Sequence, residues 1–234
     1  MNKFIKITLL FFVFNSLQIS AQTTDVVTGL GSPYGIFING NDLYIAEKVA
    51  GRISKVDISD SNPTRVDVIT NIASPSDIVL NGNDLYYING QGKLLTFDIT
   101  DPNPTPTTII SNFDSPTGIT LNESILYIAD FTGNKVMKVD ITESNPVAIT
   151  IASGLANPNN LFIDGNDLYI SNSIPGEILK LDITDPNQTL TVVVSGLNQP
   201  GNVTRYGNEL FIAEHNGNKI VKIDLNEPNP NIIE

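Results

Sequence analysis

The sequence has no cysteine, no tryptophan and a single histidine, His215. Without cysteine there are no disulfide bonds, no thiolate catalysis and no cysteine-ligated metals, so stability must come from packing, with or without bound ions. One histidine excludes a histidine-rich zinc site within one chain. His215 lies in a turn sequence, and without an evident partner or pocket we interpret it as an exposed residue rather than a general base. The chain also lacks a nucleophile elbow, a P-loop and a dinucleotide-binding fingerprint.

The chain has no apolar run long enough to cross a membrane, but its N-terminus has the pattern of an export signal. Two lysines precede an eight-residue apolar run, Ile7–Phe14, and Ala21 stands at the cleavage position. The run is far shorter than the roughly 20 residues that span a bilayer. An uncleaved anchor is the alternative interpretation. We predict a signal peptide at residues 1–21 and one exported domain at residues 22–234, which is periplasmic, on the cell surface or secreted.

Basic residues are scarce, with 13 lysines and arginines against 25 acidic residues and a net charge of −12. The predicted signal contains two lysines and no acid, so the remaining chain carries −14. A surface of this charge repels nucleic-acid phosphates and anionic membranes. The charge leaves proteins, glycans, small neutral molecules and cations as partners, with no membrane span after cleavage of the signal.

A repeat of about 42 residues runs through the rest of the chain. Residues 25–234 number 210, which is five times 42. The same landmarks recur in each copy: a proline, a Leu-Tyr or Leu-Phe pair, and an aspartate. The prolines are Pro33, Pro75, Pro116, Pro158 and Pro200, and the aspartates are Asp57, Asp98, Asp140, Asp182 and Asp224. Internal repeats of this length indicate stacked structural units.

Each copy has the pattern of four short antiparallel strands. Asn-Gly and Asp-Gly pairs such as Asn39-Gly40 supply the positive φ angles of tight hairpins, and alternating segments such as residues 135–140 indicate half-buried strands. No segment after the signal shows a sustained helical period. Four strands in about 42 residues are typical of one blade of a β-propeller, so the sequence predicts an all-β propeller with five visible blades. An open β-solenoid is the alternative.

The third copy carries a recognisable family pattern. Residues 116–121, 126–130, 133–136 and 139–140 together resemble an NHL repeat, with its Pro-x-Gly-Ile opening, its Leu-Tyr-Val-Ala-Asp strand and its Asn-x-Val strand that ends in Asp. The resemblance extends to all five copies. It implies the TolB-like group of six-bladed propellers, which includes NHL proteins and SMP-30/gluconolactonase enzymes. The missing tryptophan and double glycine set the repeat apart from WD40 and kelch units.

The sequence of the two chain ends allows two answers to the question of whether the blades form a closed ring. Residues 25–30 have the pattern of a fourth strand that no blade precedes, and residues 231–234 begin a fourth strand of the last copy. Both segments cannot fill one position. The chain therefore forms a closed five-blade ring, which we favour, or it is part of a larger, six-bladed propeller.

Two groups of oxygen-bearing side chains are candidate metal ligands. One group ends the second strand of each copy, and the other lies near the start of the innermost strand. The first group is Glu47, Asn89, Asp130, Asn172 and Glu214, and the second is Asp77, Asn160 and Asn202. Converging carboxylates and amides suit Ca²⁺ or another divalent cation, and the resemblance to SMP-30-like enzymes implies a metal in the central channel. The alternative is that these side chains only cap turns through bonds to the backbone.

A third group of acids lies in the linkers, as in Asp57-Ile58-Ser59-Asp60 and its four counterparts. Two acids three residues apart could bind Ca²⁺, but Asp and Asn are also ordinary turn formers.

The near-identical copies favour a non-enzymatic binding or interaction module, because enzymes on repeat folds usually break the symmetry at their site. The first alternative, implied by the resemblance, is a metal-dependent lactonase or related hydrolase in which Asp130 and channel amides hold the metal. The second alternative is a glycan-binding propeller with several equivalent sites.

Overall fold

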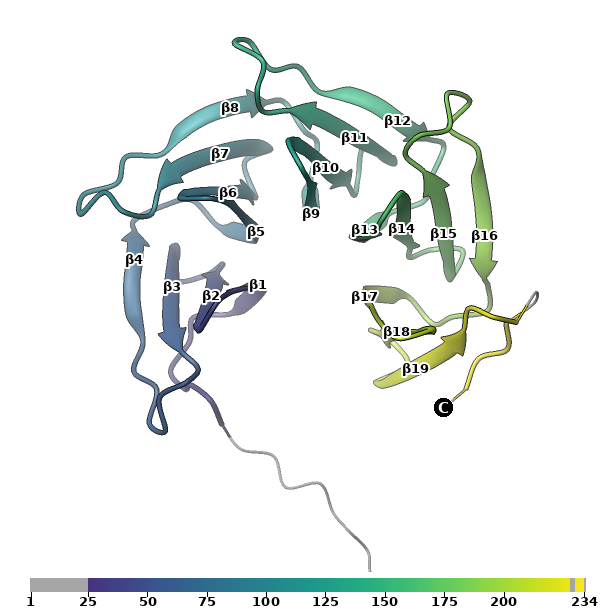
Figure 1. The fold of residues 1–234 in the computed structure, drawn as a ribbon, viewed down its shortest axis with the longest axis horizontal. Coiled ribbons are helices and arrows are strands. Elements are labelled where there is room, and N and C mark those ends of the chain that lie inside the picture. Colours follow the sequence, from purple (N-terminus) through teal and green to yellow (C-terminus); the bar gives the residue numbers. More distant parts are fainter. Residues whose placement is uncertain (1–24, 228–229, 234) are drawn as a thin grey trace, which may run out of the picture.

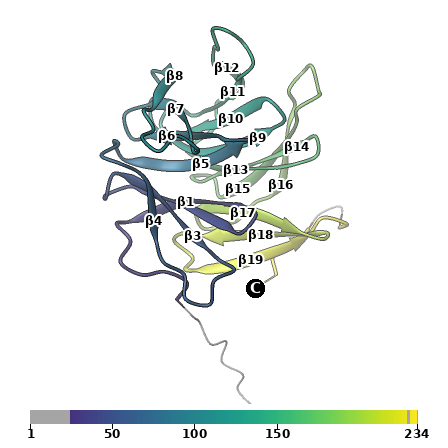
Figure 2. The ribbon, with the colours of Figure 1, turned by 60° about the vertical axis from the view of Figure 1, so that its left-hand side comes forward.

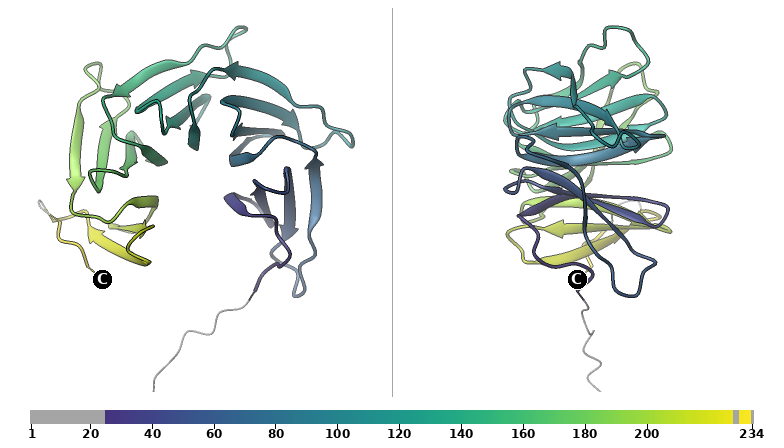
Figure 3. Two further views of the ribbon diagram at one scale, coloured as in Figure 1. Left: turned by 180° about the vertical axis from the view of Figure 1, so that it is seen from behind. Right: turned by 90° about the vertical axis from the view of Figure 1, so that its left-hand side faces the viewer.

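The computed structural model describes residues 25–227 and 230–233 (Figure 1). In this part of the chain there are strands and turns but no helix, and hence no helix long and apolar enough to cross a membrane. The strands form five antiparallel sheets in chain order, here called blades 1 to 5. The side views show the blades arranged around one axis in a single layer (Figures 2 and 3).

The first four blades have four strands each, numbered from the centre outward. Blade 1 contains β1 (Pro33–Asn39), β2 (Asp42–Glu47), β3 (Arg52–Asp57) and β4 (Val66–Thr70). Blade 2 contains β5 (Pro75–Asn81), β6 (Asp84–Asn89), β7 (Lys93–Asp98) and β8 (Thr107–Ser111). Blade 3 contains β9 (Pro116–Asn122), β10 (Ile125–Asp130), β11 (Lys135–Asp140) and β12 (Ile149–Ser153). Blade 4 contains β13 (Pro158–Asp164), β14 (Asp167–Asn172), β15 (Glu177–Asp182) and β16 (Leu190–Val194).

Blade 5 has three strands in the described part of the chain: β17 (Pro200–Tyr206), β18 (Glu209–Glu214) and β19 (Lys219–Asp224). The predicted fourth strand is reduced to one bridge between Lys222 and Ile233. The prediction of an all-β propeller with five repeats is confirmed, with this difference in the last blade.

The hairpins follow from the residues that the sequence places in them. Asn39 pairs with Asp42 across a two-residue turn whose first residue, Gly40, has a φ of 60°. Glycine adopts this angle without strain, as a type II′ hairpin requires. Each blade repeats the geometry, with Glu123 in the glycine position of blade 3 at a φ of 53°.

The hydrophobic core lies between the blades, because blades 2 to 4 carry apolar side chains on both faces of their sheets. Four hydrophobic clusters fill the four spaces between consecutive blades. Between blades 1 and 2, for example, Tyr44 and Ile53 pack with Ile78 and Tyr87. Burying one such side chain contributes roughly 1.5–3 kcal/mol. Each inner blade therefore depends on both of its neighbours.

The blades form an open arc rather than a closed ring (Figures 1 and 3). Consecutive inner strands pack side by side from β1 to β17, whereas β1 and β17 make no comparable contact. Blades 1 and 5 face each other across the opening. The closed five-blade ring that we favoured from the sequence is therefore wrong. Residues 25–30 also form no strand, so they do not complete blade 5.

Equivalent positions differ at the two ends of the arc. Ile178 in blade 4 is fully buried, whereas Ile220, 42 residues later, is 61% exposed. The two side chains are identical, but no blade packs against the face of blade 5 that carries Ile220.

This pair gives a matched test of the packing. We expect Ile178→Ala to lower the free energy of unfolding by about 2–5 kcal/mol, because it leaves a cavity between two blades. Ile220→Ala should cost about 0.5 kcal/mol or less, because the side chain is already in solvent. Urea denaturation followed by circular dichroism measures both values. Equal losses for the two variants would contradict the open arc.

Candidate functional site

A cavity of about 840 Å³ occupies the centre of the arc and is lined by residues from all five blades. The innermost strands β1, β5, β9, β13 and β17 form its wall (Figure 1). Since these strands run in the same direction, equivalent residues of the repeat reach the cavity at the same level. The cavity is thus built from corresponding positions in five copies, and its chemistry depends on how the copies differ.

The inner group of predicted ligands does line this cavity: Asp77, Asn160 and Asn202. Each stands two residues after the repeat proline. Asp77 Oδ2 accepts a hydrogen bond from the Ile119 N–H of blade 3 at 3.0 Å, and Asn160 Oδ1 accepts one from the Val203 N–H of blade 5 at 3.5 Å. Both side chains therefore tie the inner strand of their own blade to the next one.

Glycine replaces these side chains where the next blade leaves no space. A Cβ atom on Gly35 would lie 2.4 Å from Asp77 Oδ1, and one on Gly118 would lie 2.7 Å from the carbonyl oxygen of Asn159. At this repeat position, glycine therefore alternates with aspartate or asparagine from blade 1 to blade 4.

Asp77 has an unusual ionisation behaviour for an aspartate. Burial raises its pKa, the backbone N–H groups of Ile119 and Ile78 lower it, and burial prevails, so the pKa is about 7. Asp77 Oδ1 accepts the Ile78 N–H at 3.0 Å. The cavity wall therefore carries a carboxyl group that changes charge near neutral pH.

The lining also includes three large apolar or aromatic side chains, Tyr34, Phe131 and Ile174, together with His215. The Lys48 ammonium lies 4.8 Å from the centre of the Tyr34 ring. Sequence reasoning singled out only His215, as a surface residue, and it missed the other three. The signal for them is their departure from the repeat: Phe131 and His215 occupy one repeat position, which is Lys48, Gly90 and Ser173 in the other blades.

The outer group of predicted ligands ends the second strand of each blade, and all five side chains are buried. Their oxygens accept hydrogen bonds from backbone N–H groups of their own blades. Asp130 accepts from Asp114 and Ser115, Asn172 from Ala156, Glu214 from Asn198, Glu47 from Gly31, and Asn89 from Gln91 and Lys93.

These contacts are those of the turn-capping alternative, and they do not fit a channel metal well. In the described part of the chain, no three His, Cys, Asp or Glu side chains lie close enough together to hold a metal ion. Divalent cations take several oxygens at once. The backbone already occupies the oxygens proposed for this purpose, so a Ca²⁺ or other metal site stays a prediction without a matching donor set.

The linker acids have a similar role. Asp57 Oδ1 accepts from both the N–H and the hydroxyl of Ser59, and these bonds lower the pKa of Asp57. The four counterparts repeat the turn at Asp98, Asp140, Asp182 and Asp224.

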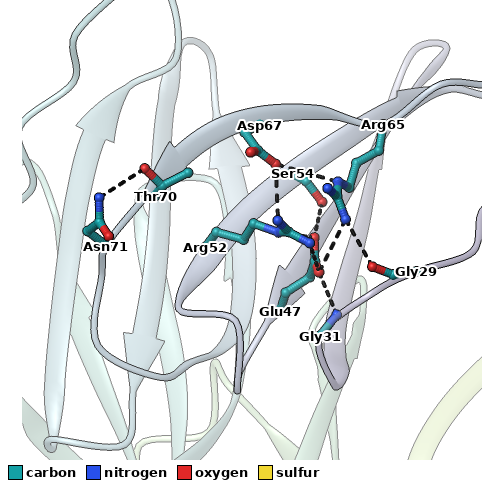
Figure 4. Close-up of polar contacts among 9 residues, drawn as sticks. All are labelled: Gly29, Gly31, Glu47, Arg52, Ser54, Arg65, Asp67, Thr70 and Asn71. Carbon is teal, nitrogen blue, oxygen red and sulfur yellow. Dashed lines mark hydrogen bonds and ion pairs between the residues drawn. The ribbon is translucent and has the colours of Figure 1, made fainter.

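Glu47 lies in a charged network with two arginines, Arg52 and Arg65 (Figure 4). Its counterparts Asp130 and Glu214 have longer ion pairs, with Lys135 at 3.6 Å and with Lys219 at 3.8 Å. Both carboxylate oxygens of Glu47 accept from Arg52 at 2.7 Å, and Oε1 also accepts from the Ser54 hydroxyl. Burial raises the pKa of Glu47, but the bonds from Arg52, Gly31 and Ser54 prevail and lower it to about 2.

The network also holds the chain that enters blade 1. Gly31 donates its N–H to Glu47 at 2.6 Å, and Arg65 Nη1 donates to the Gly29 carbonyl at 3.1 Å (Figure 4). Residues 29–31 are thereby fixed against the side of blade 1.

Comparisons with known proteins identify the fold but no family. No protein-family model matches the chain, and no curated protein is significantly similar in sequence. A structure of a nidogen/laminin complex matches with a TM-score of 0.73 and 18% identity, over 83% of this chain and 76% of that chain. Streptogramin B lyase matches with a TM-score of 0.67 and 18% identity, over 87% and 68% of the two chains. Virginiamycin B lyase from Staphylococcus aureus matches with a TM-score of 0.66 and 15% identity, over 86% and 68%. The chain is thus similar to propellers, and the likeness shows the fold alone.

Glu47 should make the protein sensitive to acid. Its folded pKa of about 2 lies below the ordinary value of 4.5, so its stabilisation is complete above about pH 4.5 and is lost as the pH falls toward 2. We expect the difference in unfolding free energy between the native chain and Glu47→Gln to shrink over this interval. Urea denaturation between pH 7 and pH 2.5 measures it. Glu143→Gln, at an exposed position, is the control, and a constant difference for Glu47→Gln would contradict the network.

Asp77 should have the opposite pH dependence. Its folded pKa of about 7 lies above the ordinary 3.8, so its contribution is complete below pH 3.8 and is lost as the pH rises through 7. Asp77→Asn keeps an oxygen acceptor for Ile119, as Asn160 does for Val203. We therefore expect the variant to gain stability relative to the native chain between pH 4 and pH 8. Asp84→Asn, at the exposed first residue of β6, is the control. The absence of any such gain would show that Asp77 is not desolvated.

Proposed function

We propose that the chain is an exported binding module that holds an uncharged polar ligand at the mouth of its central cavity. The observation that carries this proposal is the cavity itself, a space of about 840 Å³ to which every blade contributes. Binding sites for small molecules and for parts of larger partners are typically concave, with an apolar lining and a few placed polar groups.

The lining favours a neutral ligand. Its lining contains the amides of Asn160 and Asn202, the hydroxyl of Thr117, and the aromatic rings of Tyr34 and Phe131. Amides both donate and accept, and the Thr117 hydroxyl, which donates to the Asn159 carbonyl at 2.8 Å, can still accept. These groups can match the hydroxyl or peptide groups of an uncharged partner. The net charge of −12 opposes anions.

Two further lines of support come from similarity. The NHL-like pattern of the third repeat, Pro116–Asp140, supports a relation to NHL propellers. One matched structure is a complex between nidogen and laminin, so a fold of this kind occurs in a protein–protein assembly. We propose a protein segment as the first ligand class, and a glycan as the second.

The test is binding of the purified chain to a glycan array and to a panel of exported proteins, followed by the same measurement on Tyr34→Ala/Phe131→Ala. We expect the double variant to weaken binding at least about tenfold, because removing a desolvated aromatic contact costs more than the 1.4 kcal/mol of a tenfold change. The control is Val147→Ala, an exposed substitution in the loop between β11 and β12. If a ligand binds the double variant as tightly as it binds Val147→Ala, its site lies outside the cavity.

A further inference from the structure

A lysine and an acid form an ion pair on one face of three blades. The lysine is the fourth residue of the third strand, and the acid is the first residue of the second strand. The pairs are Lys55 with Asp42 at 2.8 Å, Lys180 with Asp167 at 3.0 Å, and Lys222 with Glu209. Blade 3 has the lysine but no acid, and blade 2 has the acid but no lysine.

Blade 1 shows the surroundings of this lysine. The Lys55 ammonium lies 5.9 Å from the centre of the Tyr44 ring, and Tyr44 is the cross-strand neighbour of Lys55. Asp42 stands two residues before Tyr44, so its side chain is on the same face of the sheet. The ammonium thus contacts a carboxylate and lies near an aromatic ring, and both groups attract a cation.

Blade 2 keeps the carboxylate and the ring but not the cation. Asp84 and Tyr86 stand 42 residues after Asp42 and Tyr44, and the cross-strand neighbour of Tyr86 is Thr96 instead of a lysine. Among the residues that the structure describes, no lysine or arginine forms an ion pair with Asp84. Blade 2 therefore has an acid and a ring in the arrangement that holds an ammonium in blade 1.

A cavity of about 470 Å³ lies beside Thr96 and Tyr86, between blade 2 and the loop that joins β11 to β12 in blade 3 (Figure 1). Its polar lining consists of side chains with a hydroxyl or an amide group: Tyr86, Thr96, Thr107, Thr108, Ser144 and Asn145. The rest of its lining is apolar: Ile109, Ile141 and Pro146. The cavity thus offers an apolar surface for an aliphatic chain and oxygen acceptors for a polar end.

The Thr96 hydroxyl oxygen has no partner in this cavity. It is buried, and within the described part of the chain it makes no hydrogen bond. Burial and the charge of Asp84 raise the pKa of Tyr86, while Thr96 lowers it, so both side chains lie close to the Tyr86 hydroxyl. A buried oxygen without a donor is unfavourable, and a ligand that donates to it would be stabilised.

We propose that this cavity binds a primary ammonium group on an unbranched aliphatic chain, in the place that the lysine side chain has in the other blades. The aliphatic chain packs on Ile109 and Ile141, and the ammonium reaches Asp84 and the Thr96 oxygen. An ammonium has three N–H donors and no acceptor, which suits a lining of oxygens. The net charge of −12 also favours a cation.

The site is separate from the central cavity, because the two cavities share no lining residue. Its ligand chemistry is common to a lysine side chain of a polypeptide and to a small alkyl amine. The proposal thus adds a cation site to a chain whose central cavity takes a neutral ligand.

The experiment titrates the purified chain at pH 7 and low ionic strength with n-butylamine and with the peptide acetyl-Gly-Lys-Gly-amide. The NMR shifts of the Ile109 and Ile141 methyl groups report binding, because both residues line the cavity. We expect both probes to shift these methyl groups to saturation. The same peptide with norleucine, which keeps the aliphatic chain without the ammonium, should bind at least about tenfold more weakly. Equal binding of the two peptides, or unshifted methyl groups, would overturn the proposal.

The two probes also distinguish the source of the ammonium. A lysine peptide that binds more tightly than n-butylamine supports a polypeptide partner, because its backbone adds contacts. Equal affinities support a small amine, because the ammonium and its chain then supply all of the binding.

Thr96→Lys supplies the missing lysine from within the chain. Its ammonium should pair with Asp84 and fill the cavity, so the affinity for the lysine peptide should fall at least about tenfold. Thr204→Lys, at an exposed position of β17 in blade 5, adds the same charge elsewhere and is the control. Equal losses in the two variants would show that the peptide follows the net charge of the chain, and would overturn the proposal.

Lys55→Thr is the reciprocal variant, and its result does not depend on the folding of Thr96→Lys. It leaves Asp42 and Tyr44 without their lysine, as Asp84 and Tyr86 are in blade 2. We expect isothermal titration calorimetry to show two sites for the lysine peptide in place of one. An unchanged stoichiometry would overturn the proposal, because the missing lysine would then not be what makes the site.

Discussion

The burial of apolar side chains between consecutive blades is the interaction on which the rest of the structure depends. Each blade is a thin sheet with apolar residues on both faces, and such a sheet cannot exclude water from both faces alone. The four clusters between the five blades supply this burial. Because every blade is needed by its neighbours, the arc sets the position of the inner strands and hence the shape of the cavity.

The buried polar side chains provide hydrogen-bond acceptors for backbone N–H groups that this packing removes from water. Glu47, Asn89, Asp130, Asn172 and Glu214 are buried where one strand ends, and each accepts backbone N–H groups that would otherwise lose their hydrogen bonds. A buried donor without a partner costs about 1–3 kcal/mol. These carboxylates and amides are therefore explained by the backbone that they satisfy, although their spacing alone suits a ring of metal ligands equally well.

The five copies of the repeat differ from one another in the residues that line the central cavity and in the exposure of their side chains at the two ends of the arc. The repeat position after Asp130 is Phe131 in one blade and His215 in another, and the position two residues after the proline alternates between glycine, Asp77 and asparagine. Such differences give the cavity a lining of both polar and apolar side chains. At the ends of the arc, the same isoleucine that forms core in blade 4 lies in solvent in blade 5, because a neighbour is present in one case and lacking in the other.

The sequence by itself determined the strands, the turns and the number of repeats, because these depend on local features: alternation, Asn-Gly pairs and the regular prolines. It also located Asp77, Asn160 and Asn202 at the channel. Only the tertiary structure decided whether the ring closes, because closure depends on the angle that each packed interface adds and not on any local pattern. The same holds for the fate of the buried acids and for the pKa of Asp77, since burial and the choice between a metal and a backbone partner arise only when distant segments are brought together.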